Sequence, residues 1–89
     1  MRHGLTILPE HSWRDAAPRW RAAEDMGFDH AWTYDHLVWS GLPDQPWFAA
    51  VPTLAAAATQ TERIALGTFV SSPNYRHPYV FARDVLTLH

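Results

Sequence analysis

The pair Asp35-His36 has the residue types best suited to chemistry in this sequence. It directly follows residues 29–34, whose aromatic and β-branched side chains predict a β-strand. An imidazole can donate or accept a proton near neutral pH, and a neighbouring carboxylate can accept backbone hydrogen bonds that fix the loop. Alternatively, Asp35 caps a turn and His36 is an ordinary loop residue. The position of the pair in the sequence leaves both interpretations open.

Three strands and three helices are predicted to alternate along the chain. The strands are expected at 4–8, 29–34 and 63–70. The first helix is expected to follow a cap at Ser12 or Asp15 and to end before Gly27, and the others are expected at 51–60 and from Pro78 onward. Gly27 is placed to end the first helix in a left-handed conformation. Pro18 is expected near the first turn of that helix, where a missing N–H costs little. The spacing of this β-α-β-α-β-α order favours parallel strands joined by right-handed crossovers.

The apolar pattern of the third predicted strand helps to decide between a barrel and an open sheet. Residues 64–67, Ile-Ala-Leu-Gly, are apolar at both parities, and such a strand must be covered on both faces. A Rossmann-type sheet would usually carry G-x-G-x-x-G after the first strand, where this chain has Pro-Glu-His-Ser at 9–12. We therefore predict an α/β fold, a partial (β/α)8 TIM barrel made of its first three βα units over residues 1–89. A flavodoxin-like domain, with the third strand beyond the first, is the less favoured alternative.

In such a barrel the active site lies at the C-terminal ends of the strands. Three segments meet that condition: 8–11, Asp35-His36 and 69–72. Asp35, His36 and His77 could suggest a metal site, but no His-x-His pair lies on a strand, and we expect no metal. Arg76-His77 precedes the helix expected at Pro78, where an anion can bind. The simpler interpretation of these two residues is a solvated helix cap.

Aromatic residues are frequent in and after the second predicted strand. They could line an apolar pocket or belong to the core, and we expect about half of them to be structural. The residues in question are Trp32, Tyr34, Trp39, Trp47 and Phe48.

The composition is that of an ordinary globular chain, with 89 residues of which 47% are hydrophobic and 18% charged. The chain has no cysteine, which excludes disulfides, thiolate zinc sites and cysteine nucleophiles. Its 7 basic and 9 acidic residues form no basic stripe, so nucleic acid is not an expected partner. Apolar runs such as 54–58 are too short for a membrane span, and the first segment is too short for a signal peptide. We therefore expect a cytoplasmic protein.

Several motifs taken together carry a family resemblance. They are AEDMGFDHAW at 23–32, DHL at 35–37, AATQTERIALGT at 57–68, RHP at 76–78 and ARDVLTL at 82–88. In this combination the chain resembles the bacterial luciferase-like group of flavin- and deazaflavin-dependent oxidoreductases. The resemblance extends from Gly4 to Leu88.

The resemblance implies a (β/α)8 barrel that binds a deazaflavin, coenzyme F420, or FMN without a covalent bond and transfers hydride. F420 is the first choice, and the FMN members commonly activate oxygen. By the same resemblance, His36 is an active-site acid or hydrogen-bond donor and Asp35 contacts the cofactor. Phe69-Val70 occupies the place of a bulge with a non-proline cis peptide against the ring face. Ser72 is expected to hydrogen-bond the ring edge.

Family chains continue well beyond the length of this one. A barrel of about 250 residues holds about 31 per βα unit, so about five units and the usual phosphate site are expected to be missing. We therefore expect an N-terminal part of an oxidoreductase or monooxygenase that acts on a small molecule and is inactive alone. The alternative is a non-catalytic barrel segment that forms a homo-oligomer or complements another fragment, because its strand edges are uncovered. The substrate cannot be inferred, since barrel substrates are contacted by several loops.

Overall fold

The computed structural model describes residues 1–37, 44–72 and 74–89. Its elements alternate between strand and helix in the order predicted from the sequence. They are β1 (Gly4–Thr6), α1 (Trp13–Asp25), β2 (His30–Thr33), α2 (Ala50–Ala58), β3 (Ala65–Thr68) and α3 (Pro78–Leu88). None of the helices in these described ranges is long and apolar enough to cross a membrane.

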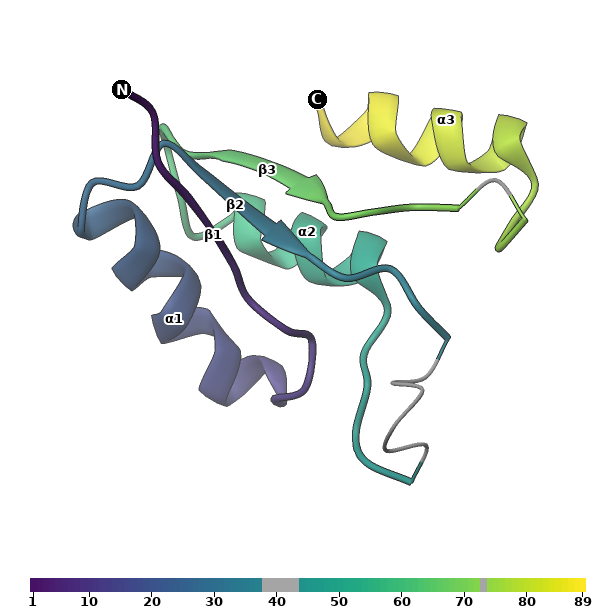
Figure 1. Ribbon diagram of the computed structural model, residues 1–89, viewed down its shortest axis with the longest axis horizontal. Helices are drawn as coiled ribbons and strands as arrows, with labels where there is room; N and C mark the ends of the chain where they lie inside the picture. The colour runs from purple at the N-terminus through teal and green to yellow at the C-terminus, as the bar shows by residue number, and fades with distance from the viewer. Residues whose placement is uncertain (38–43, 73) are drawn as a thin grey trace.

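The three strands form one parallel sheet in the order β1-β2-β3 (Figure 1). Leu5 pairs with Ala31, and Ala31 pairs with Leu66, so the strands are aligned across the sheet. This order confirms three successive βα units and excludes the flavodoxin-like alternative, in which the third strand lies beyond the first. Parallel strands bring all three carboxyl ends to the same edge of the sheet.

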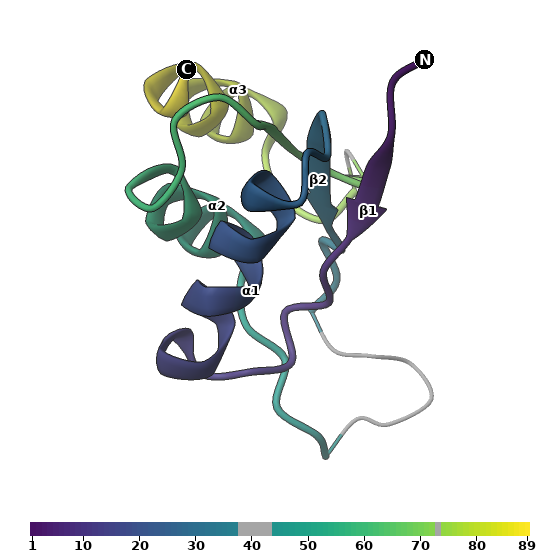
Figure 2. The same ribbon diagram turned by 90° about the vertical axis from the view of Figure 1, so that its left-hand side faces the viewer.

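The helices lie on one side of the strands, as the turned view shows (Figure 2). The core lies between them and the sheet: Trp20 and Ala23 of α1 and Ala57 of α2 are buried against Ala31 of β2. Leu5 and other partly buried apolar residues pack against this cluster. Small side chains dominate the core, so the helices approach the sheet closely around the single large ring of Trp20.

Gly27 accounts for the C-terminal end of α1. Gly27 has φ 88°, the left-handed conformation expected for it, and the next amide, Phe28 N–H, donates back to Ala23 O at 3.2 Å. The prediction for Pro18 is wrong, because the helix begins at Trp13 and Pro18 is its sixth residue. The ring therefore removes an interior helix hydrogen bond, the one that residue 18 would donate to Arg14 O.

Glu24 joins α1 to the turn that precedes β3. Its carboxylate accepts the backbone N–H groups of three successive residues, with oxygen–nitrogen distances of 2.9 Å to Glu62, 2.6 Å to Arg63 and 2.9 Å to Ile64. The Glu24 side chain is only 10% exposed. These bonds explain why β3 begins later than the predicted residue 63, because the amide of Arg63 donates to Glu24 and not to the segment at the start of β2. The same bonds, that from Arg63 foremost, lower the pKa of the Glu24 carboxyl.

The sheet face opposite the helices carries large rings beside glycines. Trp32 Nε1 donates to His30 Nδ1 at 2.6 Å, and the two rings meet edge to face. A Cβ at Gly4 would lie 1.9 Å from His30 Nδ1, and a Cβ at Gly67 would lie 2.6 Å from Trp32 Cζ3. Glycine on the flanking strands therefore lets both rings lie across the sheet.

Candidate active site at the strand ends

The ends of β2 and β3 bring two of the predicted site segments side by side. The parallel pairing continues one residue past β3, where Phe69 N–H donates to Thr33 O at 2.9 Å. Asp35 and His36 follow β2, and Phe69 to Ser72 follow β3, so both segments leave the same edge of the sheet. The third predicted segment, 8–11, follows β1, and its Pro9 carbonyl accepts the amide of Phe48 at 2.7 Å.

Asp35 is the centre of a buried polar network. Its side chain is 1% exposed. The guanidinium of Arg76 donates to both carboxylate oxygens, with Nη1–Oδ2 at 2.5 Å and Nη2–Oδ1 at 2.6 Å. Ser71 Oγ donates to Asp35 Oδ2 at 2.6 Å and lies 2.8 Å from Thr68 Oγ1. One carboxylate therefore connects the end of β2, the end of β3 and the start of α3.

The charge of Asp35 is stabilised by this network. Burial alone would raise the pKa of the Asp35 carboxyl, but the hydrogen bonds from Arg76 and Ser71 and the charge of Arg76 outweigh it, and the pKa is lowered. The hydrogen bonds that Arg76 donates to Asp35 in turn raise the pKa of Arg76. The pair is thus a bidentate ion pair in which both partners hold their charge.

His36 has different surroundings from its neighbour. Its side chain is exposed, and its ring meets that of Tyr34 edge to face, with centroids 5.8 Å apart. The indole of Trp47 lies 6.5 Å from the imidazole, between centroids, and Trp47 Nε1 donates to the His36 carbonyl at 3.0 Å. Asp35 is therefore buried and anchored, whereas the imidazole of the adjacent His36 is exposed and flanked by aromatic rings.

The peptide bond between Phe69 and Val70 is cis, at the place that the family resemblance predicted. Phe69 is 58% exposed and Val70 62% exposed, so both present apolar surface at the strand ends. The Phe69 ring lies edge to face with Trp32, their centroids 6.4 Å apart. Phe69 is thereby placed on the same face of the sheet as the Trp32 ring.

Ser72 lies on the exposed side of the same loop, where its Oγ accepts the amide of Asn74 at 3.2 Å. The serine that joins the buried network is its neighbour Ser71. Sequence reasoning assigns neither Ser71 nor Arg76 to this network: Ser71 lies in the predicted segment 69–72 without a role of its own, and Arg76 is expected only at a helix cap or an anion site. The solvated cap expected for Arg76 is wrong, because its guanidinium is bound to Asp35, 41 residues away in the chain.

His77 forms the cap of α3, with Nδ1 accepting the amide of Tyr79 at 3.2 Å. The two rings stack, with centroids 5.9 Å apart. Within residues 1–37, 44–72 and 74–89, no group of three histidine, aspartate or glutamate side chains is arranged to hold a metal ion.

The aromatic residues that the structure describes in and after β2 fall into separate groups. Trp32 contacts His30 and Phe69, whereas Tyr34 and Trp47 flank His36, with 6.4 Å between the centroids of these two flanking rings. Trp39 lies outside the described residues. Tyr34 and Trp47 thus lie at the imidazole, whereas Phe48 lines a cavity with Trp13 and Trp20 of α1.

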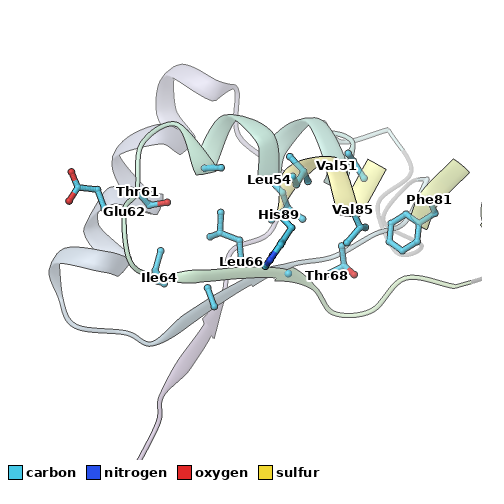
Figure 3. Close-up of a pocket in the computed structure, with 14 residues that line it drawn as sticks. Val51, Leu54, Thr61, Glu62, Ile64, Leu66, Thr68, Phe81, Val85 and His89 are labelled. Carbon is cyan, nitrogen blue, oxygen red and sulfur yellow. The ribbon is translucent and has the colours of Figure 1, made fainter. Parts of the chain in front are cut away.

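A cavity lies between α2, α3 and β3, and its lining includes Thr68 at the end of β3 (Figure 3). It has a volume of about 650 Å³ and a mainly apolar lining that includes Leu54, Leu66, Phe81 and Val85. A second cavity, of about 350 Å³, lies between α1, α2 and the segment after β1. Neither cavity is lined by Asp35, His36 or Arg76.

Three successive parallel βα units, with candidate residues gathered at the carboxyl ends of the strands, define a protein of the βα-barrel class. The match to known proteins gives the family. The chain belongs to the luciferase-like monooxygenase family, whose model matches residues 1–89.

Curated relatives are similar over most of the chain. An F420-dependent glucose-6-phosphate dehydrogenase from Beutenbergia cavernae is 45% identical over 74 residues, covering 74% of this chain and 20% of the relative. A 5,10-methylenetetrahydromethanopterin reductase from Methanopyrus kandleri is 34% identical over 85 residues, covering 96% of this chain and 22% of the relative. The chain thus spans about a fifth of the length of these relatives.

Solved structures share the fold. A coenzyme F420-dependent tetrahydromethanopterin reductase from Methanopyrus kandleri superposes with a TM-score of 0.82 at 31% identity, covering 98% of this chain and 23% of that structure. An F420-dependent secondary alcohol dehydrogenase superposes with a TM-score of 0.80 at 24% identity, covering 99% and 28% of the two chains. Both likenesses support a partial TIM barrel.

Proposed function

We propose that the protein carrying this chain is an F420-dependent oxidoreductase that transfers hydride between F420 and a small organic molecule. The observation that carries the proposal is the 45% identity to a relative whose name states F420 dependence. A reductase structure that is F420-dependent by name, with a TM-score of 0.82, supports the same cofactor. The proposal concerns the whole protein, because the chain spans about a fifth of these relatives.

The strand-end residues fit a flat deazaflavin ring. Such a ring needs an apolar surface for its face and polar groups at its edge, and Phe69 and Val70 present apolar surface where β3 ends. The exposed imidazole of His36 follows the adjacent strand, and the hydroxyl of Ser72 follows Phe69-Val70. When bound, the cofactor supplies the hydride chemistry, while these residues supply orientation and proton placement.

We assign His36 the role of active-site acid or hydrogen-bond donor. Its ring is held between Tyr34 and Trp47, and the Trp47 indole anchors its backbone carbonyl, so the imidazole is exposed yet oriented. General acids and bases act best when their pKa lies near the working pH, as an imidazole allows. Ser72 is proposed as a donor to the edge of the ring.

Contact between Asp35 and the cofactor stays a prediction of the family resemblance. The carboxylate oxygens of Asp35 are bonded to Arg76 and Ser71 and its side chain is 1% exposed. These bonds favour a supporting role, in which Asp35 holds the loop that carries His36.

The cofactor is tested by titrating the protein, at its natural length, with F420 and with FMN while following cofactor fluorescence. We expect saturable binding of F420. If FMN bound more tightly than F420, the cofactor would be FMN. If neither cofactor bound, the proposed function would be wrong. His36→Ala should leave binding within a few fold and reduce hydride transfer by about 10²–10⁴-fold, as for loss of a general acid. The matched control is His3→Ala, an exposed histidine at the opposite end of the sheet.

A further inference from the structure

Arg76 is held more firmly than its ion pair with Asp35 alone would require. Its guanidinium carbon lies 4.3 Å from the centroid of the Tyr75 ring and 4.9 Å from that of the Phe81 ring. The side chain is 22% exposed. Cation–π contacts on two rings, together with a bidentate carboxylate, fix the plane of the guanidinium as well as its position.

The fixed guanidinium holds Asp35, which in turn binds Ser71, and these two residues are adjacent in the chain to residues of the candidate site. Asp35 is covalently adjacent to His36, so anchoring the Asp35 carboxylate restricts the backbone segment from which the His36 side chain leaves. Ser71, bonded to the same carboxylate, is adjacent to Val70 of the cis peptide. The network thereby sets the spacing between the segment that carries His36 and the segment that carries Phe69-Val70.

We propose that Arg76 is a positioning residue, which acts through Asp35 and Ser71 to hold His36 and the Phe69-Val70 segment in the relative placement that the cofactor ring requires. The cofactor in this inference rests on the proposed function. The positioning role of Arg76 rests on the geometry of the network. It gives Arg76 two separable contributions. The bidentate fork fixes geometry, and the positive charge compensates the buried carboxylate.

Two substitutions separate these contributions. Arg76→Lys keeps the charge but loses the planar fork, whereas Arg76→Gln loses both. In Arg76→Gln the buried Asp35 carboxylate still accepts a hydrogen bond from Ser71, whose hydroxyl also contacts Thr68. His36 remains a neighbouring charge when its imidazole is protonated. Burial then raises the pKa of Asp35, because the guanidinium no longer opposes it. The matched controls are Arg83→Lys and Arg83→Gln, at an exposed arginine on α3 outside the network.

The first measurement needs no cofactor. In ¹⁵N-labelled protein, we follow the indole N–H resonance of Trp47, which is bonded to the His36 carbonyl, and the exchange rate of the Phe69 amide, which is bonded to Thr33. Arg76→Gln should shift the indole resonance and speed amide exchange at Phe69 at least tenfold, with a smaller effect for Arg76→Lys. Unchanged values in Arg76→Gln would overturn the inference, whether or not a cofactor binds.

The second measurement is the Kd for F420 across a pH series. We expect Arg76→Gln to weaken binding about tenfold or more near neutral pH, since a misplacement of about 1 Å can cost as much as 100-fold. The ratio of its Kd to the wild-type Kd should fall as the pH is lowered and Asp35 takes up a proton. Arg76→Lys should show a smaller ratio that is constant with pH. A merely structural role predicts ratios independent of pH in both variants, and that result would overturn the inference.

A failure of the proposed function gives a different pattern from a failure of this inference. If wild-type protein bound neither cofactor, the proposed function would be wrong, and the indole and amide measurements would still decide the role of Arg76. If wild-type protein bound F420 and both Arg76 variants bound it equally well, the inference would be wrong and the proposed function would stand.

Discussion

Trp32 and Gly67 are direct neighbours across the sheet, and the indole occupies the space that a side chain at position 67 would need. They are paired in the register of β2 and β3, and a Cβ at Gly67 would lie 2.6 Å from Trp32 Cζ3. The requirement for glycine here is steric, because the backbone is ordinary strand and the obstacle is the ring of Trp32.

The first prediction is that Gly67→Ala destabilises the protein by about 1–3 kcal/mol, the usual cost of overpacking. Urea unfolding followed by circular dichroism measures this loss. In a Trp32→Leu background the obstacle is gone, and Gly67→Ala should then cost less than about 0.5 kcal/mol. An equal cost in both backgrounds would show that Trp32 is not the obstacle.

The second prediction concerns the carboxylate of Glu24. Glu24→Gln should lower the urea midpoint, because an amide oxygen is a weaker acceptor than a carboxylate for the N–H groups of Glu62, Arg63 and Ile64. Since the folded state lowers the pKa of Glu24, its contribution is complete above the ordinary value of 4.5 and is lost as the pH falls through the folded pKa.

The measurement for Glu24 is the stability difference between wild type and Glu24→Gln at pH 7 and at successively lower pH. The difference should shrink with acid. Asp25→Asn, at an exposed carboxylate one residue along, is the control and should change stability little at either pH. A difference for Glu24→Gln that stayed constant with pH would contradict a role for the charge.

The third prediction concerns the proline inside α1. Pro18 is exposed, and Pro18→Ala restores an N–H that can donate to Arg14 O. We expect a gain of about 2 kcal/mol in unfolding free energy, after allowance for the greater entropy of the unfolded chain. Pro78→Ala is the control, because Pro78 begins α3, where no such bond is missing, and it should lose up to about 1 kcal/mol. Thermal unfolding of both variants gives the comparison.

The fourth prediction is that Asp35→Asn destabilises the protein by about 3 kcal/mol at pH 7. This value is at the low end for breaking a buried ion pair, because the Arg76 side chain is 22% exposed and can regain water. Burial raises the pKa of Asp35, but the bonds from Arg76 and Ser71 leave it below the ordinary 3.8. The contribution of Asp35 is therefore complete above pH 3.8 and lost as the pH falls through the folded value. Urea unfolding at pH 7 and near pH 3 checks both statements, and equal losses at the two pH values would contradict them.

The repeating elements of the fold could be predicted because each has a local signature. Gly27 marks the end of α1, the alternation of strands and helices favours parallel pairing, and the order β1-β2-β3 follows from successive crossovers. The start of β3 was misplaced for a physical reason. Whether the amide of Arg63 pairs with β2 or with Glu24 depends on a carboxylate 39 residues away in the chain.

The candidate site was predicted less completely than the fold. His36 and Asp35 lie in a motif that carries the family resemblance, and the resemblance also implied the cis bond at Phe69-Val70. The ion pair between Asp35 and Arg76 has no local signature, because the partners are 41 residues apart and meet only when the ends of β2 and β3 come together. The position of Arg76 at a helix start suggested solvent exposure, and only the fold shows the carboxylate that it faces.

The division of labour between the adjacent residues Asp35 and His36 has a consequence for protein engineering. The side chain of His36 is exposed and lies beside the rings of Tyr34 and Trp47, so a library randomised at position 36 would sample catalytic outcomes while most members still fold. The same library at position 35 would be filtered first by folding, and survivors would be few. Evolving a new specificity on this scaffold should therefore vary residue 36 while leaving its neighbour untouched.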